Sequence, residues 1–262
     1  MKKYLYILSF AFKEQLEYRL NFFLGILTMV INDAIFLFIF VIFLSYFTGT
    51  GLTFGNFLLI HSVIAFQYAI VNGVFSNIWD LPNLIEEWKL DYYLSFPINI
   101  LWFIACSKIK VHNLWDVLFA LIAMFVYAFH FHDWLAVPFI IKWVIISIIA
   151  LIFAAWLFIL VGSISFWLQK WSKVRDLFQS FFLVFGSYPP DIFRQKRLIF
   201  IMVSMIGLYP WVFLPYQMMA WETNIVSRFI LIFSSIAMFI LWVYTFHRWL
   251  ARYSSWNLVI QM

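Results

Sequence analysis

Long apolar stretches dominate this chain, and short polar clusters separate them. A helix needs about 20 apolar residues to cross the hydrocarbon core of a bilayer. Stretches of roughly this length or longer cover residues 21–47, 57–79, 113–131, 143–168 and 225–246. The pattern predicts an all-α polytopic membrane protein in which each of these stretches is a transmembrane helix.

The region before the last of these stretches breaks the pattern. Residues 177–188 are apolar but stop at Pro189 and Pro190, because proline lacks an amide donor and disfavours helix in the residue before it. A second short apolar run, residues 198–208, is closed by Pro210 and Pro215. Each run is about half as long as a crossing requires. We therefore expect a shallow fifth helix over residues 174–188 and a re-entrant hairpin within residues 189–220, for six transmembrane helices in all.

The first 17 residues have a different periodicity. Leu5, Leu8 and Phe12 recur at steps of three and four residues, and charged residues such as Lys13 and Glu14 lie on the opposite side. This pattern predicts an amphipathic helix that lies in the membrane interface. The charges interrupt the apolar core that a cleaved signal peptide would need.

The composition agrees with a lipid environment. Hydrophobic residues make up 66% of the 262 residues, aromatic residues 23% and charged residues only 11%, whereas globular proteins have about 25% charged residues. A soluble fold of this size has too few polar residues to cover its surface. A soluble enzyme, a nucleic-acid-binding domain and a disordered tail are excluded, and no nucleic-acid partner is expected.

The charge distribution predicts the orientation. The chain has 17 basic and 12 acidic residues, and basic residues concentrate in cytoplasmic loops. With the N-terminus inside, the inner segments hold most of the basic residues: Lys2, Lys3, Lys13, Arg19, Lys89, Lys108, Lys110, Lys170, Lys173, Arg175, Arg248 and Arg252. We expect a multi-pass protein of the inner (plasma) membrane with both termini in the cytoplasm.

The motifs of common enzymes are absent from the sequence. Neither GxxxxGK[ST] nor GxGxxG occurs, so no phosphate-binding loop is present, and neither HExxH nor GxSxG occurs. We expect no catalytic residue and no cofactor on this chain. The nearest approach to a metal site is His130, His132 and Asp133, which fits an interfacial polar turn better than a metal site, so no metal is predicted.

Two groups of polar residues are candidates for function. Asn32 and Asp33 interrupt the first span, and a carboxylate there costs about 2.5–3.5 kcal/mol on insertion scales, so it should face protein or water. It either lines a translocation path or forms a polar helix interface. Arg194, Lys196 and Arg197 form a basic cluster in the re-entrant region, where they contact lipid headgroups or an anionic substrate.

Local motifs resemble those of the ABC-2 type permeases, the membrane-spanning subunits of ABC transporters. The similarity is to a small branch whose members pair with a separate ATPase subunit. It extends over nearly the whole chain and is carried by the architecture and by three elements: Leu90-Asp91-Tyr92-Tyr93-Leu94-Ser95-Phe96-Pro97, Tyr188-Pro189-Pro190-Asp191-Ile192-Phe193, and Tyr209-Pro210 with Pro215. Arg194 stands where a proline often follows in that branch.

This resemblance implies a function and partners. The chain would be a single permease domain that forms a pore, as a homodimer or heterodimer, with a second permease, and it would work as an exporter. ATP and Mg would be held by a partner ATPase. The charged loop over residues 80–112 would supply a coupling helix at residues 84–93, with contacts from Glu86, Glu87, Trp88, Lys89, Asp91, Tyr92 and Tyr93.

Two other classes of function stay open on the sequence. One is a proton- or cation-coupled secondary transporter that uses Asp33. The other is a membrane scaffold without transport. An ATPase partner favours the permease, and strict sensitivity to uncouplers favours the secondary transporter.

Overall fold

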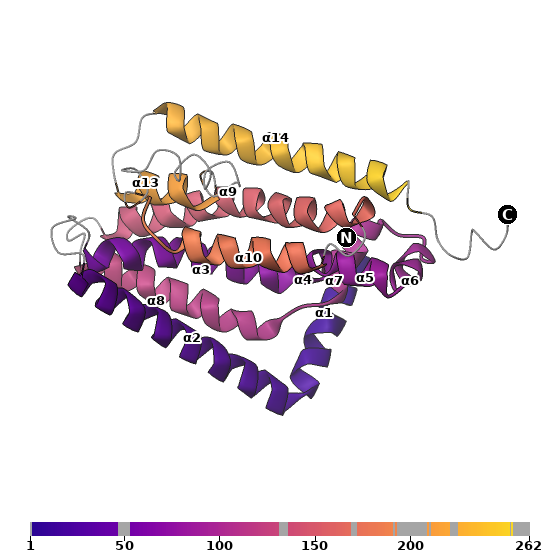
Figure 1. Cartoon of the computed structure of the whole chain (residues 1–262), viewed down its shortest axis with the longest axis horizontal. Helices are drawn as coiled ribbons and strands as arrows, with labels where there is room; N and C mark the ends of the chain where they lie inside the picture. The colour runs from indigo at the N-terminus through magenta and orange to yellow at the C-terminus, as the bar shows by residue number, and fades with distance from the viewer. Residues whose placement is uncertain are drawn as a thin grey trace.

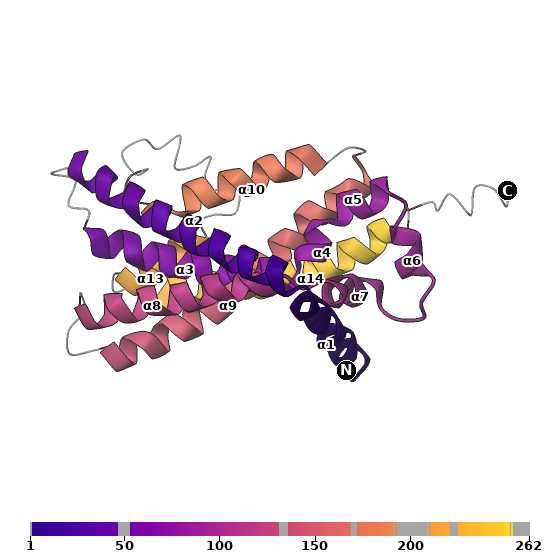
Figure 2. The same ribbon diagram turned by 90° about the horizontal axis from the view of Figure 1, so that it is seen from below.

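The computed structural model describes residues 2–46, 53–130, 136–168, 172–190, 192, 209, 211–220, 225–251 and 253. Every regular element in these residues is helical, and the long helices run side by side as one bundle (Figures 1 and 2). Four helices in the described part are long and apolar enough to cross a membrane: Arg19–Ser45, Phe54–Val74, Val111–His130 and Val137–Phe166. The all-α membrane architecture is confirmed, whereas six crossings stay a prediction.

Helix α1 (Lys2–Glu17) turns away from helix α2 (Arg19–Tyr46), as both views show (Figures 1 and 2). Ala11 is buried, and α1 packs against α7 (Ile100–Ser107). The backbone N–H of Asn99, which precedes α7, donates to the hydroxyl oxygen of Tyr4 at 3.2 Å. Most large apolar side chains of α2 are exposed, as expected for a helix that faces lipid or another membrane protein.

Helix α3 (Phe54–Val74) is the central helix of the bundle. The Thr53 hydroxyl caps its N-terminus by accepting from the Asn56 backbone N–H at 3.4 Å. Its side chains are buried on several sides, because α3 packs against both α8 (Leu114–His130) and α9 (Ala136–Ser163). The indole N–H of Trp143 on α9 donates to Ser62 at 3.2 Å, which ties the two helices together.

The connecting segment, residues 75–113, leads from α3 to α8. It contains α4 (Ser76–Trp79), α5 (Leu81–Glu86), α6 (Leu90–Leu94), α7 and the 3₁₀ turn η1 (Val111–Asn113). The expected single helix over residues 84–93 is instead two helices, because the chain turns at residues 87–89. Trp88 has a φ of 58°, a left-handed conformation that no α-helix can continue through.

Helix α9 continues into the 3₁₀ turn η3 (Ile164–Phe166) and packs along α14 (Ile225–Leu250). The last predicted span, residues 225–246, therefore lies within one helix. The outward face of α14 exposes Phe229, Phe233 and Ile240. These side chains give α14, like α2, a surface suited to an apolar solvent.

The regions of the predicted fifth helix, residues 174–188, and of the re-entrant hairpin, residues 189–220, each contribute one described α-helix. Helix α10 (Ser172–Gly186) begins before the apolar run that predicted it, and it has only 15 residues. Helix α13 (Leu214–Ala220) packs against α9 and α3. Trp211 and Phe213, which lead into α13, are almost fully buried. Their burial suits irregular backbone at membrane depth, and re-entry itself stays a prediction.

Candidate functional site

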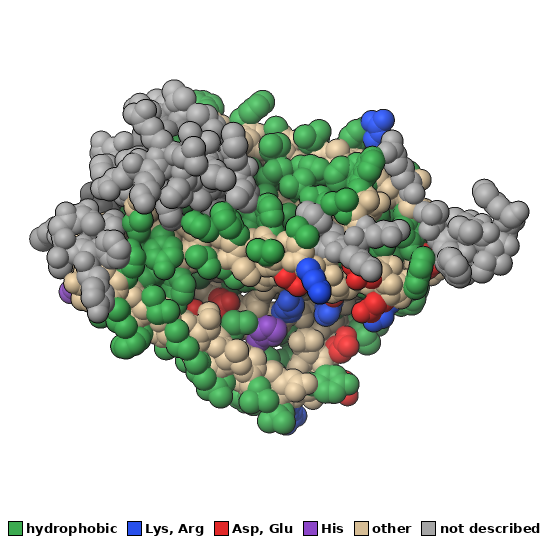
Figure 3. All heavy atoms as spheres, viewed as in Figure 1, with side chains coloured by type: hydrophobic (Ala, Val, Ile, Leu, Met, Phe, Trp, Pro, Cys, Tyr) green, Lys and Arg blue, Asp and Glu red, His purple; other side chains and the backbone are tan. Residues whose placement is uncertain are grey.

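A polar cavity of about 450 Å³ lies between α2, α3, α8 and α10. Figure 3 shows the surface hollowed between α2 and α10, with charged and histidine side chains inside the hollow. Its polar lining comes from four helices, the end of the connecting segment and the residue that follows α10: Thr28, Asn32, Asp33, His61, Tyr68, Asn72, Lys110, His112, Asp116, Gln179 and Ser187. The two residues predicted to line a path or an interface, Asn32 and Asp33, both lie here.

Asp33 is 5% exposed and has two polar neighbours in the cavity wall. Trp115 on α8 donates its indole N–H to Asp33 Oδ2 at 3.2 Å. His61 Nε2 on α3 lies 3.8 Å from Asp33 Oδ1, which is too long for a hydrogen bond. Phe36 on α2 stacks on the His61 ring at 4.7 Å between centroids. Asp33 therefore joins three helices at one point.

The connecting segment closes one end of the cavity. Lys110 Nζ donates to Asn72 Oδ1 at 3.3 Å, and the Lys110 backbone N–H donates to Gly73 O at 3.1 Å. Burial lowers the pKa of Lys110, and the positive charges of Lys108 and Arg175 add to this effect. Asp116 lines the same cavity.

Helix α10 links the cavity to the connecting segment. Gln179 accepts from the Trp79 indole N–H at 3.0 Å and donates to the Tyr68 hydroxyl. One turn earlier, Arg175 Nη1 donates to Trp79 O at 3.0 Å and to Asp80 Oδ1 at 3.3 Å. These hydrogen bonds connect Trp79 and Asp80 to α10 and, through Gln179, to the cavity wall at Tyr68.

The residues predicted to contact an ATPase lie together on the connecting segment. Glu86, Glu87, Trp88, Lys89 and Tyr92 are exposed, and Asp91 and Tyr93 are partly buried. Tyr93 lies on the inner side of α6, where the Asn77 side-chain amide donates to its hydroxyl at 3.0 Å. Five of the seven predicted residues are therefore exposed, and contact of the seven with an ATPase stays a prediction.

The predicted outer residues are described only in part. Pro189 and Pro190 are buried, and Pro215 belongs to α13. Tyr188 packs among Phe40, Phe43 and Phe57, with centroids 5.6–6.3 Å apart. Arg194, Lys196, Arg197 and Pro210 lie outside the described residues. The basic cluster therefore stays a prediction.

The sequence prediction does not include three cavity residues of α3, namely His61, Tyr68 and Asn72. They recur at steps of seven and four residues, which places them on one face of a helix. A polar stripe with that period inside an apolar span was the signal that could have found them. Lys110, His112 and Gln179 carry no such signal, because folding brings them to the cavity from other segments.

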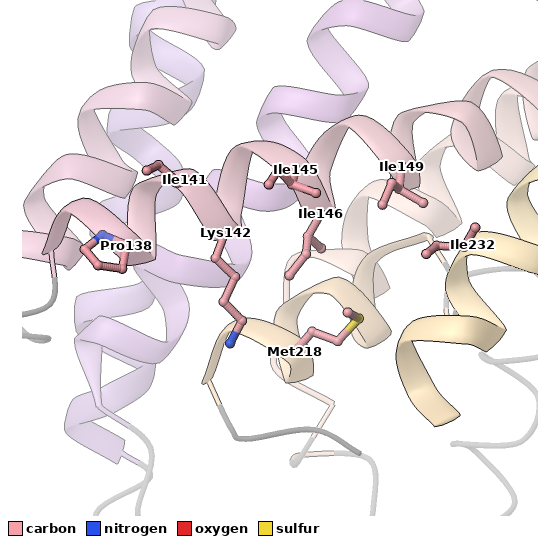
Figure 4. Close-up of a pocket in the computed structure, with 8 residues that line it drawn as sticks. All are labelled: Pro138, Ile141, Lys142, Ile145, Ile146, Ile149, Met218 and Ile232. Atoms are coloured by element: carbon pink, nitrogen blue, oxygen red, sulfur yellow. The ribbon is translucent and has the colours of Figure 1, made fainter. Parts of the chain in front are cut away.

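A second hollow, of about 490 Å³, is almost entirely apolar. Isoleucines of α9 line it together with Pro138, Lys142, Met218 and Ile232 (Figure 4). The Lys142 side chain extends toward α13 in this view. With so few polar groups to select a ligand, this groove fits an aliphatic chain such as a lipid tail better than a specific substrate.

Comparison with known proteins gives one family. The sequence profile of a family described as "ABC-2 family transporter protein" matches residues 5–256. No curated protein and no solved structure matches the chain.

Proposed function

Because the chain belongs to the ABC-2 family of transporter proteins and is a membrane-spanning permease of that class, we propose that a separate ATPase subunit powers it by docking on the connecting segment. The observation that carries this proposal is the family match over nearly the whole chain. ABC permeases need ATP hydrolysis, and the sequence has no phosphate-binding loop.

The shape of the connecting segment supports docking at α5 and α6. Trp88 is 54% exposed and Tyr92 is 61% exposed, and large aromatic side chains of this kind tend to dominate interface energies. Glu86, Glu87 and Lys89 surround them with polar groups. A protein subunit fits this arrangement, because it has aromatic anchors and a polar rim.

The hydrogen bonds of α10 support a route for the motion. Docking that shifts α5 also shifts Asp80, which precedes it and pairs with Arg175. Arg175 is 7% exposed, so its bonds are shielded from water and geometrically restrictive. We infer that α10 moves with the connecting segment and changes the shape of the cavity.

A second permease chain completes the proposed transporter. The exposed apolar face of α2 borders the polar cavity. A second permease packed on this face would therefore close the side of the cavity that is open in a single chain. A homodimer and a heterodimer both fit. Export is the direction implied by the resemblance to the family.

The docking proposal is tested by co-purification of the ATPase with permease variants. The double variant Trp88→Gly/Tyr92→Ala removes both anchors, and glycine tolerates the positive φ of residue 88. We expect most of the ATPase to be lost from detergent pull-downs. Tyr6→Ala is the control, since Tyr6 is an exposed aromatic residue of α1. Retention of the ATPase by the double variant at the wild-type level would contradict the assignment.

The proximity of Asp33 and His61 supports a second candidate function, proton-coupled secondary transport. A carboxylate beside an imidazole in a membrane span can exchange protons, as a proton-coupled secondary transporter requires. Transport in proteoliposomes distinguishes the two. ATP dependence with insensitivity to uncouplers supports the ABC permease, and transport driven by a proton gradient without any ATPase supports the alternative.

A further inference from the structure

Asp33 is a buried carboxylate in the wall of the polar cavity. The Trp115 indole donates to it, and His61 lies 3.8 Å away, but no Lys or Arg side chain in the described residues forms an ion pair with it. Lys110, which also lines the cavity, is bonded to Asn72 instead. A buried charge without compensation is costly, so Asp33 favours a monovalent cation beside it.

Two acceptors in the cavity are not fully satisfied. His61 is 7% exposed, and neither ring nitrogen has a hydrogen-bond partner in the described residues. Asp116 likewise has no hydrogen bond or ion pair with a described side chain. Buried polar groups are normally hydrogen-bonded. A ligand with N–H donors would meet this deficit at His61 while it neutralises Asp33.

The rest of the lining narrows the class of cation. No group of three His, Cys, Asp or Glu side chains in the described residues is arranged to hold a metal ion. The lining also contains an apolar part, formed by Met29, Phe36, Ile64, Leu183 and Val184. A volume of about 450 Å³ is also far larger than a bare ion needs. An organic cation with an apolar body matches the charge, the donors and the wall together.

We propose that this cavity binds the protonated amine of an amphiphilic organic cation. The ammonium group pairs with Asp33 and donates a hydrogen bond to His61, and the apolar body lies along Phe36, Ile64 and Val184. This inference rests on the proposed function, since it names the class of substrate that the permease would carry. The cavity lies between α2 and α10, where the surface is hollowed (Figure 3).

The test is binding of dansylcadaverine, a fluorescent primary amine, to the full-length chain in nanodiscs. We expect a saturable increase and blue shift of dansyl emission above that of empty nanodiscs. Its N,N,N-trimethyl analogue has the same charge but no N–H donor, and it should bind at least about tenfold more weakly, as expected for loss of a hydrogen bond to a charged group. Equal binding of the two probes would overturn the proposal, as would no saturable binding of either.

Variants then assign the binding to this cavity. Asp33→Asn keeps the shape and removes the charge, and His61→Phe keeps the ring volume and removes the acceptor. Each should weaken dansylcadaverine binding about tenfold or more. Glu14→Gln, which removes an exposed carboxylate on α1, should bind like the wild type. Wild-type affinity in both cavity variants would show that the probe binds elsewhere, for example in the apolar groove, and would refute this site.

Two features of the design keep the outcomes separate. The comparison of the two probes uses only the wild-type chain, so it decides the question even if a cavity variant does not fold. The assay contains no ATPase, so a failure to bind the amine leaves the docking proposal untouched. Conversely, if the pull-down contradicts the docking proposal, the binding assay still shows whether the cavity binds the amine.

Discussion

At the scale of single residues, two helical glycines differ sharply in the space around them. A Cβ built on Gly162 of α9 would lie 2.4 Å from the carbonyl oxygen of Ile78, whereas one on Gly73 of α3 would meet ordinary contacts at 3.9 Å. Gly162→Ala should destabilise the protein by about 1–3 kcal/mol, because backbone has to move. Gly73→Ala should change stability by less than about 1 kcal/mol. Thermal unfolding of the two variants in detergent checks the difference, and equal melting temperatures would contradict it.

The single cysteine reports on the connecting segment. Burial raises the pKa of the Cys106 thiol on α7, and only the thiolate reacts with alkylating agents. Alkylation by iodoacetamide should therefore be slower at neutral pH than that of a free thiol, and its rate should still rise at a pH where the free thiol has reached its plateau. Rates measured against N-acetylcysteine in the same detergent provide the check. Matching pH profiles would mean that Cys106 is effectively exposed.

The candidate site could be predicted from the sequence only in part. Asp33 was identifiable because a charge within a span is costly wherever it lies. The partners of Asp33 were not identifiable, because Trp115 and His61 reach it from two other helices. Local periodicity orders residues along one helix but does not say which faces of separate helices meet.

At the scale of elements, α10 depends on its first turn. Arg175 there bonds to the Trp79 carbonyl and pairs with Asp80 at 3.3 Å. Arg175→Met should destabilise the protein by about 1.5–3 kcal/mol, because the Trp79 carbonyl loses its charged donor. Asp80 is partly exposed and keeps Lys108 at 3.7 Å, so it is not left as a buried, unpaired charge. Lys89→Met removes one partner of the exposed Lys89–Glu87 pair and should leave the melting temperature unchanged. If the two variants have the same melting temperature, the Arg175 contacts do not stabilise the position of α10.

Element positions could be predicted from hydrophobic length, and the breaks between elements could not. The apolar stretches coincide with α2, α3, α8, α9 and α14, because burial in lipid or protein demands such stretches. The turn at Trp88 contains no glycine or proline that would have predicted it from the sequence. The early start of α10 was also hidden, because Lys173 and Asp176 make its first turn polar.

At the scale of the whole molecule, the orientation of the bundle in the membrane can be tested by labelling single cysteines from each side. In a Cys106→Ser background, Ser95→Cys should react with an impermeant maleimide only from the cytoplasmic side. Thr53→Cys and Thr223→Cys should react only from the outside. This pattern follows from the distribution of basic residues. Labelling of Thr223→Cys from the cytoplasm alone would mean a true crossing within residues 189–220 and would rule out the re-entrant hairpin.

The bonds from Trp79 through Gln179 to Tyr68 bear on how much substrate the proposed complex moves for each ATP that it hydrolyses. If these contacts enforce one transport event for each cycle of the ATPase, then Gln179→Leu should uncouple ATP hydrolysis from transport. We expect hydrolysis to continue while the amount of substrate moved per ATP falls several-fold. Simultaneous measurement of phosphate release and transport in proteoliposomes gives that ratio. An unchanged ratio would mean that the stoichiometry is set elsewhere in the molecule.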